Sequence, residues 1–288
     1  MVTSQIIQQY GVIGNPISQS KSPLIHTYFA TLTSQDMQYH KLLAPIDGFE
    51  VFVQNFIKSG GLGANVTVPF KEAAYRLCDE LSNEAALAGA VNTLMFKEGI
   101  IYGDNTDGKG LINDLKNRHA INLTHKTILL VGAGGAARGI LAPILSELPD
   151  RVIILNRTLA RAEALREIFK DKSQDYQKIM AVDFDQFDDF MKSTGILVDI
   201  IINASSASLQ GNIRPLPIQL FCKPKHLIVY DLMYQTGLTA FLKYCQSHGV
   251  VLLYDGLGML VEQAALSFEI WRGIKPSTDE IYKKLKNS

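Results

Sequence analysis

The feature that most constrains the fold is a glycine-rich stretch at residues 131–139, Val-Gly-Ala-Gly-Gly-Ala-Ala-Arg-Gly. An apolar, β-branched run at 127–131 precedes it, and apolar residues at helical spacing follow it from Ile140. The pattern G-x-G-x-x-A between a strand and a helix predicts a turn whose free N–H groups bind a pyrophosphate. A tight turn without a ligand is the alternative, but the flanking elements favour a dinucleotide site. The residues of this turn are Gly132, Ala133, Gly134, Gly135, Ala136 and Ala137.

The next predicted strand, 151–155, indicates which dinucleotide binds. It ends in Asn156-Arg157-Thr158, and Arg161 follows one helical turn later. An NAD site usually has Asp or Glu here for the ribose 2′-hydroxyl, whereas guanidinium groups hold a 2′-phosphate. Solvated arginines at the start of a surface helix are the alternative. Their coincidence with the required position favours NADP(H) as the cofactor.

Composition narrows the class of protein. The chain has 288 residues, of which 47% are hydrophobic, so two domains with substantial cores are expected. Lys plus Arg equals Asp plus Glu, 28 each, so no net charge attracts nucleic acid or an acidic membrane. No apolar run approaches the roughly 20 residues of a membrane span. We therefore expect a small-molecule substrate, and neither nucleic acid nor a membrane as partner.

The three cysteines indicate the compartment. Cys78, Cys222 and Cys245 are widely spaced and form no C-x-x-C pair, which predicts neither a disulfide framework nor a zinc site. The first residues lack the pattern of a signal peptide. We expect a cytoplasmic protein without a metal, and a homodimer is compatible with the sequence.

Alternating strand and helix patterns predict an α/β fold with two domains. The first has strands near 10–14, 39–43 and 63–68, a hairpin at 91–102, and a mostly parallel sheet. Its first helix is expected to start at Ser22-Pro23, with the serine hydroxyl as N-cap.

Six further strands predict a Rossmann sheet in the second domain. Two helices follow, 259–271 and a polar one through 286, and these are expected to return to the first domain. The predicted division is residues 1–107 plus 256–288 for substrate binding and catalysis, and 108–255 for NADP binding. The six strands are 127–131, 151–155, 178–182, 199–202, 226–230 and 250–253.

Three polar clusters stand out from their apolar surroundings. They are Ser18–Ser22, Asn65-x-Thr67-x-Pro69-x-Lys71, and Asn92 with 104–107. Strand alternation would place Asn65, Thr67 and Pro69 on one face. Turn and helix-cap chemistry can explain each cluster separately. Together they suit a small polyhydroxylated acid, with the proton donor that a nicotinamide dehydrogenase needs.

In this order and spacing, the motifs resemble those of the shikimate dehydrogenase family nearly from end to end. The resemblance rests on the glycine loop, on Asn156–Thr158 and on six further motifs. These are Gly14–Pro23 (GNPISQSKSP), Asn65–Lys71 (NVTVPFK), Ala90–Thr93 (AVNT), Gly103–Gly108 (GDNTDG), Tyr230–Tyr234 (YDLMY) and Gly256–Gln263 (GLGMLVEQ).

The resemblance implies a reversible, NADPH-dependent reduction of 3-dehydroshikimate to shikimate on the route to chorismate and aromatic amino acids. It implies an active site in a cleft between the two domains, with Lys71 and Asp107 as the catalytic pair. The implied substrate-binding residues are Ser20, Ser22, Asn65, Thr67, Asn92, Tyr234 and Gln263. The implied cofactor residues beyond the glycine loop are Asn156, Arg157, Thr158 and Arg161 at the 2′-phosphate, with Gly256 and Met259 near the nicotinamide.

Lys71 can give its proton to the oxygen that becomes negative as hydride arrives. Burial tends to discharge a lysine, and Asp107 opposes this, since a unit charge at ~4 Å contributes about 4 kcal/mol at an effective dielectric of ~20.

One segment departs from the family. The family usually has Asn-Ala-Thr followed closely by glycine after the fourth Rossmann strand, whereas 203–211 reads Asn-Ala-Ser-Ser-Ala-Ser-Leu-Gln-Gly. Ser205 keeps a hydroxyl, so we expect a changed loop shape with retained activity.

Two alternatives stay open. A quinate/shikimate dehydrogenase shares this layout, although the arginine-bearing turn and the Ser20/Ser22 pair favour the strict shikimate type. A non-catalytic NADPH-binding regulator would need neither Lys71 nor Asp107, so the presence of both argues against it.

Overall fold

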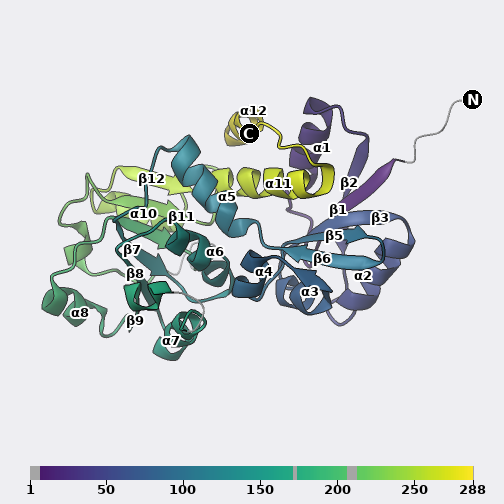
Figure 1. Cartoon of the computed structure of the whole chain (residues 1–288). Coiled ribbons are helices and arrows are strands. Elements are labelled where there is room, and N and C mark those ends of the chain that lie inside the picture. The colour runs from purple at the N-terminus through teal and green to yellow at the C-terminus, as the bar shows by residue number, and fades with distance from the viewer. Residues whose placement is uncertain (1–6, 171–173, 206–212, 288) are drawn as a thin grey trace, which may run out of the picture. The chain divides into compact units, whose positions relative to one another are not determined.

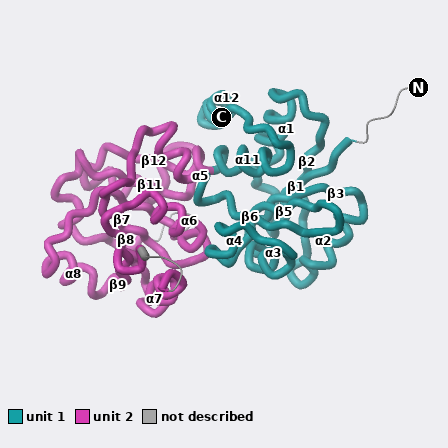
Figure 2. Tube along the Cα trace, in the orientation of Figure 1, with its two compact units in different colours: residues 1–110, 260–287 teal, residues 111–259, 288 magenta. Residues whose placement is uncertain are grey.

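The computed structural model describes residues 7–170, 174–205 and 213–287 (Figure 1). The chain divides into two compact units (Figure 2). Unit 1 comprises residues 1–110 and 260–287, and unit 2 comprises residues 111–259. The C-terminal segment therefore belongs to the same unit as the N-terminal segment.

The sheet of unit 1 has six strands in the order β2-β1-β3-β5-β6-β4. β1 pairs in parallel with β2 and β3, β4 pairs in parallel with β6, and β5 is antiparallel to β3 and β6. The sheet is thus mixed, because the predicted hairpin β5–β6 reverses the chain direction. The strands are β1 Gln8–Gly14, β2 Met37–Leu43, β3 Gly61–Val66, β4 Glu80–Leu81, β5 Thr93–Lys97 and β6 Ile100–Asp104.

Helices α1 to α4 and α12 belong to unit 1, and α5 and α11 contribute to both units. Helix α2 buries Phe49 and Val53 against the sheet, and it ends before Gly60, whose φ of +93° suits glycine. The bounds are α1 Ser22–Leu32, α2 Phe49–Lys58, α3 Lys71–Leu77, α4 Asn83–Ala88, α5 Asp107–Asn113, α11 Leu257–Arg272 and α12 Asp279–Lys286.

Two local predictions in unit 1 are wrong. Ser22 is the first residue of α1 and not its N-cap: Lys21 holds that position, and the Ser22 hydroxyl bonds to Tyr39 instead of capping the helix. Strand β3 ends at Val66, and the Phe70 N–H donates to the Thr67 carbonyl in a turn around Pro69. Thr67 and Pro69 therefore do not share a strand face with Asn65.

Unit 2 contains the predicted Rossmann sheet. Its order, β12-β11-β10-β7-β8-β9, is the doubly wound order, and all five strand pairs are parallel. The strands are β7 Thr127–Val131, β8 Arg151–Asn156, β9 Ile179–Asp183, β10 Ile200–Asn203, β11 Ile228–Asp231 and β12 Leu252–Asp255. The helices are α6 Gly135–Ser146, α7 Leu159–Glu167, α8 Phe187–Thr194 and α10 Ala240–Ser247, with single turns at Asp114–Arg118, Gln174–Lys178 and Ile218–Phe221.

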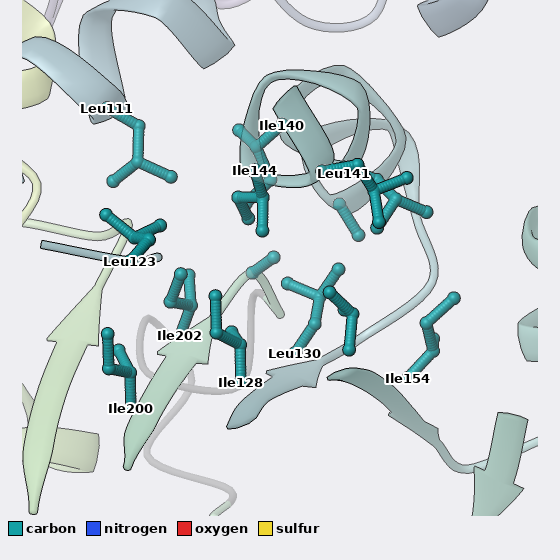
Figure 3. Close-up of a cluster of buried hydrophobic side chains, with 14 of the residues drawn as sticks. Leu111, Leu123, Ile128, Leu130, Ile140, Leu141, Ile144, Ile154, Ile200 and Ile202 are labelled. Atoms are coloured by element: carbon teal, nitrogen blue, oxygen red, sulfur yellow. The ribbon is translucent and has the colours of Figure 1, made fainter. Parts of the chain in front are cut away.

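Helix α6 covers one face of this sheet and fixes the glycine turn before it. Its apolar side chains lie against alternate residues of the strands, as Figure 3 shows for Ile140 and Ile144 over Ile128 and Leu130. All four side chains are fully buried. This packing anchors the start of α6 at the carboxyl end of β7.

Among the described helices, none combines the length and apolar character that crossing a membrane requires.

The connection from β12 to α11 depends on a glycine that faces backbone. A Cβ added at Gly256 would lie 2.0 Å from the carbonyl oxygen of Leu232. Backbone cannot move aside as a flexible side chain can. The glycine therefore has a packing role within unit 2, whatever it contributes near a cofactor.

We expect Gly256→Ala to lower the free energy of unfolding by about 1–3 kcal/mol through overpacking, measured by urea denaturation. Gly135→Ala is the matched control, because a Cβ there meets no atom within 4 Å. Equal stability of the two variants would contradict the packing role.

Candidate active site

The polar clusters of unit 1 gather at one edge of its sheet. Residue pairing aligns Ile13 with Val66, Asn65 with Thr93, and Thr93 with Asp104. The ends of β1, β3 and β6 therefore lie beside the start of β5. The loops after β1 and β3 touch, since the Asn15 N–H donates to the Val68 carbonyl at 3.1 Å.

Lys71 and Asp107 form an ion pair at this edge. Lys71 Nζ lies 2.5 Å from Asp107 Oδ2, and each residue begins a helix, α3 and α5 respectively. The lysine side chain is 32% exposed and the carboxylate 15% exposed. An ammonium with a fixed carboxylate partner and access to solvent can exchange a proton with a bound molecule.

Asn92 fixes the position of that carboxylate. Its Nδ2 donates to Asp107 Oδ1 at 2.8 Å, while its Oδ1 accepts the Thr106 N–H at 2.9 Å and the Thr93 hydroxyl at 2.8 Å. The two acceptor contacts orient the amide, so its N–H group faces Asp107. One carboxylate oxygen is thereby held by Asn92 and the other by Lys71.

Gln263 approaches the same group from α11. Its Oε1 lies 3.4 Å from Asn92 Nδ2, and its own Nε2 donates to the Leu260 carbonyl at 2.7 Å. Gly110 on α5 permits this approach, because a Cβ there would lie 2.8 Å from the Gln263 backbone nitrogen. The structure therefore brings together four predicted residues, Lys71, Asn92, Asp107 and Gln263.

Asn65 is a second buried amide, behind Asn92. Its Oδ1 accepts the Tyr39 hydroxyl at 2.7 Å and lies 3.1 Å from His26 Nε2. Its Nδ2 donates to the Asn92 carbonyl at 3.1 Å and to Ser267 Oγ at 2.9 Å. These contacts occupy all the hydrogen-bonding positions of the amide. In this state Asn65 supports the Asn92 backbone.

The remaining predicted substrate residues differ in exposure. Ser22 is buried and its hydroxyl bonds to Tyr39, a contact that partly offsets the rise in the pKa of Tyr39 caused by burial. Ser20 and Thr67 are half-buried. Tyr234 belongs to unit 2, and burial raises the pKa of its phenol.

His26 is a site component that the sequence analysis missed. It is fully buried and stacks on Tyr39 at a centroid distance of 4.2 Å, and its Nδ1 has no partner among the described residues. Burial lowers the pKa of His26 to about 3, although the Asn65 hydrogen bond opposes this. The signal was its position one turn after Ser22 on the same face of α1.

Unit 2 contains a cavity of about 850 Å³ at the glycine turn. Nine of the predicted cofactor residues line it, whereas Ala137 is fully buried behind the turn, and Gly256 and Met259 do not line it. The nine are Gly132, Ala133, Gly134, Gly135, Ala136, Asn156, Arg157, Thr158 and Arg161. Residues without a motif, such as Phe184 and Arg214, complete the wall.

The turn itself suits a pyrophosphate. Gly132 has a φ of +108°, and a Cβ there would lie 3.2 Å from the Ala204 and Ser205 backbone. Cβ atoms added at Gly134 or Gly135 would meet nothing within 4 Å. Open space thus lies before the first N–H groups of α6, which have no partner within the helix.

The arginines suit a 2′-phosphate. Arg157 and Arg161 are exposed, and neither has a carboxylate partner among the residues that the structure describes. Asn156 Nδ2 donates to the Thr158 carbonyl at 2.9 Å and so closes the turn that carries Arg157. The cavity therefore fits NADP(H). No cluster of three or more His, Cys, Asp or Glu in the described part could hold a metal ion.

The departing segment is only partly described. Ser205 donates its hydroxyl to Asn203 Oδ1 at 2.7 Å, and Asn203 Nδ2 donates to Asp231 at 2.9 Å. Residues 206–211, which carry the shifted glycine, lie outside the described residues.

The chain matches three families, described as shikimate dehydrogenase substrate binding domain over residues 12–94, shikimate / quinate 5-dehydrogenase over 114–212, and shikimate 5′-dehydrogenase C-terminal domain over 256–286. It is 46% identical over 290 residues to the shikimate dehydrogenase (NADP(+)) of Colwellia psychrerythraea, covering 100% of this chain and 99% of the relative. The chain belongs to the shikimate dehydrogenase family. The family resemblance inferred from the motifs is thus confirmed.

Solved structures agree with this family assignment. An Ael1 enzyme from Pseudomonas putida matches with a TM-score of 0.87 and 40% identity, over 96% of this chain and 98% of that one. The shikimate 5-dehydrogenase of Thermus thermophilus in complex with NADP(H) and shikimate matches with a TM-score of 0.82 and 29% identity, over 97% and 99%. The predicted fold, an N-terminal α/β unit completed by C-terminal helices plus a Rossmann unit, is confirmed.

The buried His26 predicts an acid-dependent loss of stability. In the unfolded chain, His26 binds a proton below its ordinary pKa of 6.5. In the folded chain it stays neutral until about pH 3, so the unfolded state binds more protons between these two pH values. Above about pH 6.5 this difference in proton binding vanishes and costs no stability. By about pH 4.5 it lowers the free energy of unfolding by about 2–3 kcal/mol.

We expect His26→Gln to remove that part of the pH dependence, measured by urea denaturation at both pH values. Since each protein is compared with itself, a general loss of stability in the variant cancels. The same pH dependence in both proteins would show that His26 is charged in the fold.

Proposed function

We propose that this chain catalyses the reversible, NADPH-dependent reduction of 3-dehydroshikimate to shikimate, the reaction that the family resemblance implies. The observation that carries the proposal is the Lys71–Asp107 ion pair, whose carboxylate is held by Asn92. A proton donor in a fixed position, beside hydroxyl and amide groups, is what reduction of a polyhydroxylated ketone requires. A cytoplasmic location and a homodimer stay predictions.

Lys71 is the acid in this mechanism. NADPH, when bound, supplies a hydride to the carbonyl carbon, and Lys71 Nζ gives a proton to the oxygen at C3. Asp107 lies 2.5 Å from Nζ and orients the ammonium. Because the lysine is partly exposed, water can reprotonate it. In the oxidation of shikimate, Lys71 takes the proton back.

The substrate contacts are proposed for the residues that the family resemblance implies. Ser20 and Ser22 lie at the start of α1 and suit the carboxylate, since hydroxyls and helix N–H groups donate there. Gln263 lies beside Asn92 near the ion pair and, with Thr67, suits the ring hydroxyls. The substrate contact of Tyr234, which belongs to unit 2, stays a prediction of the resemblance. Asn65 and Asn92 are assigned supporting roles, because both amides are already occupied by protein groups.

The cofactor assignment rests on the cavity of unit 2. The N–H groups at Gly134–Ala136 would hold the pyrophosphate, and Arg157 and Arg161 the 2′-phosphate. At residue level, the division into a substrate-binding domain, 1–107 plus 256–288, and an NADP-binding domain, 108–255, is part of this proposal.

The test follows NADPH absorbance with 3-dehydroshikimate, and NADP⁺ reduction with shikimate and then quinate. We expect turnover of shikimate and a much smaller rate with quinate. Comparable rates with quinate would favour the quinate/shikimate alternative. NADPH binding without turnover of either acid would favour the regulator.

We expect Lys71→Ala to lower kcat by roughly 10²–10⁴-fold, because the general acid is lost while the hydroxyl and amide contacts to substrate remain. Lys109→Ala is the matched control, since Lys109 also pairs with a carboxylate in unit 1, Glu84 at 2.7 Å, and not with Asp107. Steady-state kinetics measures the effect, with circular dichroism to verify folding. A folded Lys71→Ala variant as active as the Lys109→Ala control would refute the mechanism.

We expect Arg157→Ala to weaken NADPH binding by roughly ten-fold or more and NADH binding little, because only NADPH loses a charge-assisted contact. Fluorescence titration with both cofactors measures this. Equal losses would mean that Arg157 does not bind the 2′-phosphate.

A further inference from the structure

A third arginine lines the cofactor cavity and belongs to no nucleotide-binding motif. Arg214 shares the wall with Arg157 and Arg161. It lies in the irregular segment between β10 and Ile218–Phe221, far along the chain from the other two. Only the fold brings it to this cavity, within unit 2.

The sheet register places Arg214 at one end of the cavity. Asn156 pairs with Asp183, so Arg157 and Phe184 are the first residues beyond the neighbouring strands β8 and β9. The guanidinium carbon of Arg214 lies 4.8 Å from the centre of the Phe184 ring, and its NH2 nitrogen pairs with Asp185. Arg214 is therefore held at the end of β9.

The strand order indicates that the adenosine of a bound dinucleotide would lie at the β9 end of the cavity. The glycine turn follows β7, the Asn156–Thr158 turn follows β8, and Arg214 lies at β9, in the order β7-β8-β9. A dinucleotide with its pyrophosphate at the glycine turn has its adenine ribose at the end of β8. Arg214 thus lies beyond that ribose, on the side away from the pyrophosphate.

Asp185, the present partner of Arg214, binds it too weakly to exclude a phosphate. The side chains of Arg214 and Asp185 are 42% and 78% exposed, and exposed ion pairs contribute little. A phosphate offers more charge than a carboxylate, and a guanidinium can hold it with two parallel hydrogen bonds. The Phe184 ring keeps the guanidinium in place during such an exchange.

We propose that Arg214 determines specificity for NADP(H) by exchanging Asp185 for the 2′-phosphate. This inference rests on the proposed NADP-binding function of unit 2. Arg214 would act as a third cation beside Arg157 and Arg161. Asp185 would compete with the 2′-phosphate for Arg214 and so weaken cofactor binding.

The test uses two probes that differ only in the 2′-phosphate, 2′,5′-ADP and 5′-AMP, titrated calorimetrically against the full chain. We expect Arg214→Ala to weaken 2′,5′-ADP by about 5–30-fold and 5′-AMP by less than about two-fold. We expect Asp185→Asn to tighten 2′,5′-ADP by about 2–5-fold, which a purely structural arginine would not produce. Arg214→Lys should keep part of the preference.

The outcomes distinguish a failure of the Arg214 inference from a failure of the proposed NADP-binding function. If the unaltered chain does not prefer 2′,5′-ADP, the NADP assignment fails. If it does prefer 2′,5′-ADP, an equal loss of both probes in Arg214→Ala would show a contact to adenine and overturn the inference. An unchanged affinity in Arg214→Ala, or no tightening in Asp185→Asn, would also overturn it.

Discussion

The amide of Asn92 is the group on which the site of unit 1 depends. It receives the Thr106 N–H and the Thr93 hydroxyl on its oxygen and gives its N–H to Asp107. An inverted amide would set donor against donor at Thr106, so the hydrogen bonds permit one orientation. Asp107 is left with one oxygen for Lys71. The orientation of Lys71, the proposed proton donor, thus depends through Asp107 and Asn92 on the buried N–H of Thr106.

The hydrogen bonds around Asn92 also give a role to the segment after the Rossmann sheet, residues 260–287, which belongs to unit 1. Asn65 and Thr93 are buried polar groups, and leaving such a group unpaired costs about 1–3 kcal/mol. Ser267 on α11 lies 2.9 Å from Asn65 Nδ2 and 2.8 Å from Thr93 Oγ1, and it is fully buried. Helix α11 therefore supplies both the hydroxyl behind Asn92 and Gln263 beside it. Helix α11 is thus part of the site of unit 1.

Prediction from the sequence succeeded where the signal was local. The six Rossmann strands and the glycine turn follow from apolar runs and glycine spacing. Arg157 lines the cavity, as its place after the second strand predicts, and its contact with a 2′-phosphate stays a prediction. It failed where long-range pairing decides. The mixed sheet depends on the β3–β5 pairing, and the occupied amide of Asn65 depends on a serine 202 positions later. Arg214 carries no motif, and only the fold places it beside Phe184.

The central claim is that Lys71 and Asp107 act as one unit, and a double-mutant cycle tests it most directly. kcat/KM is measured for Lys71→Ala, Asp107→Ala and the double variant, with NADPH binding as the control for folding. Since Asp107 acts through the lysine that it holds, the account predicts that the double variant is no slower than Lys71→Ala alone, within about two-fold. Losses that multiply in the double variant would mean that Asp107 acts independently of Lys71, and would contradict the account.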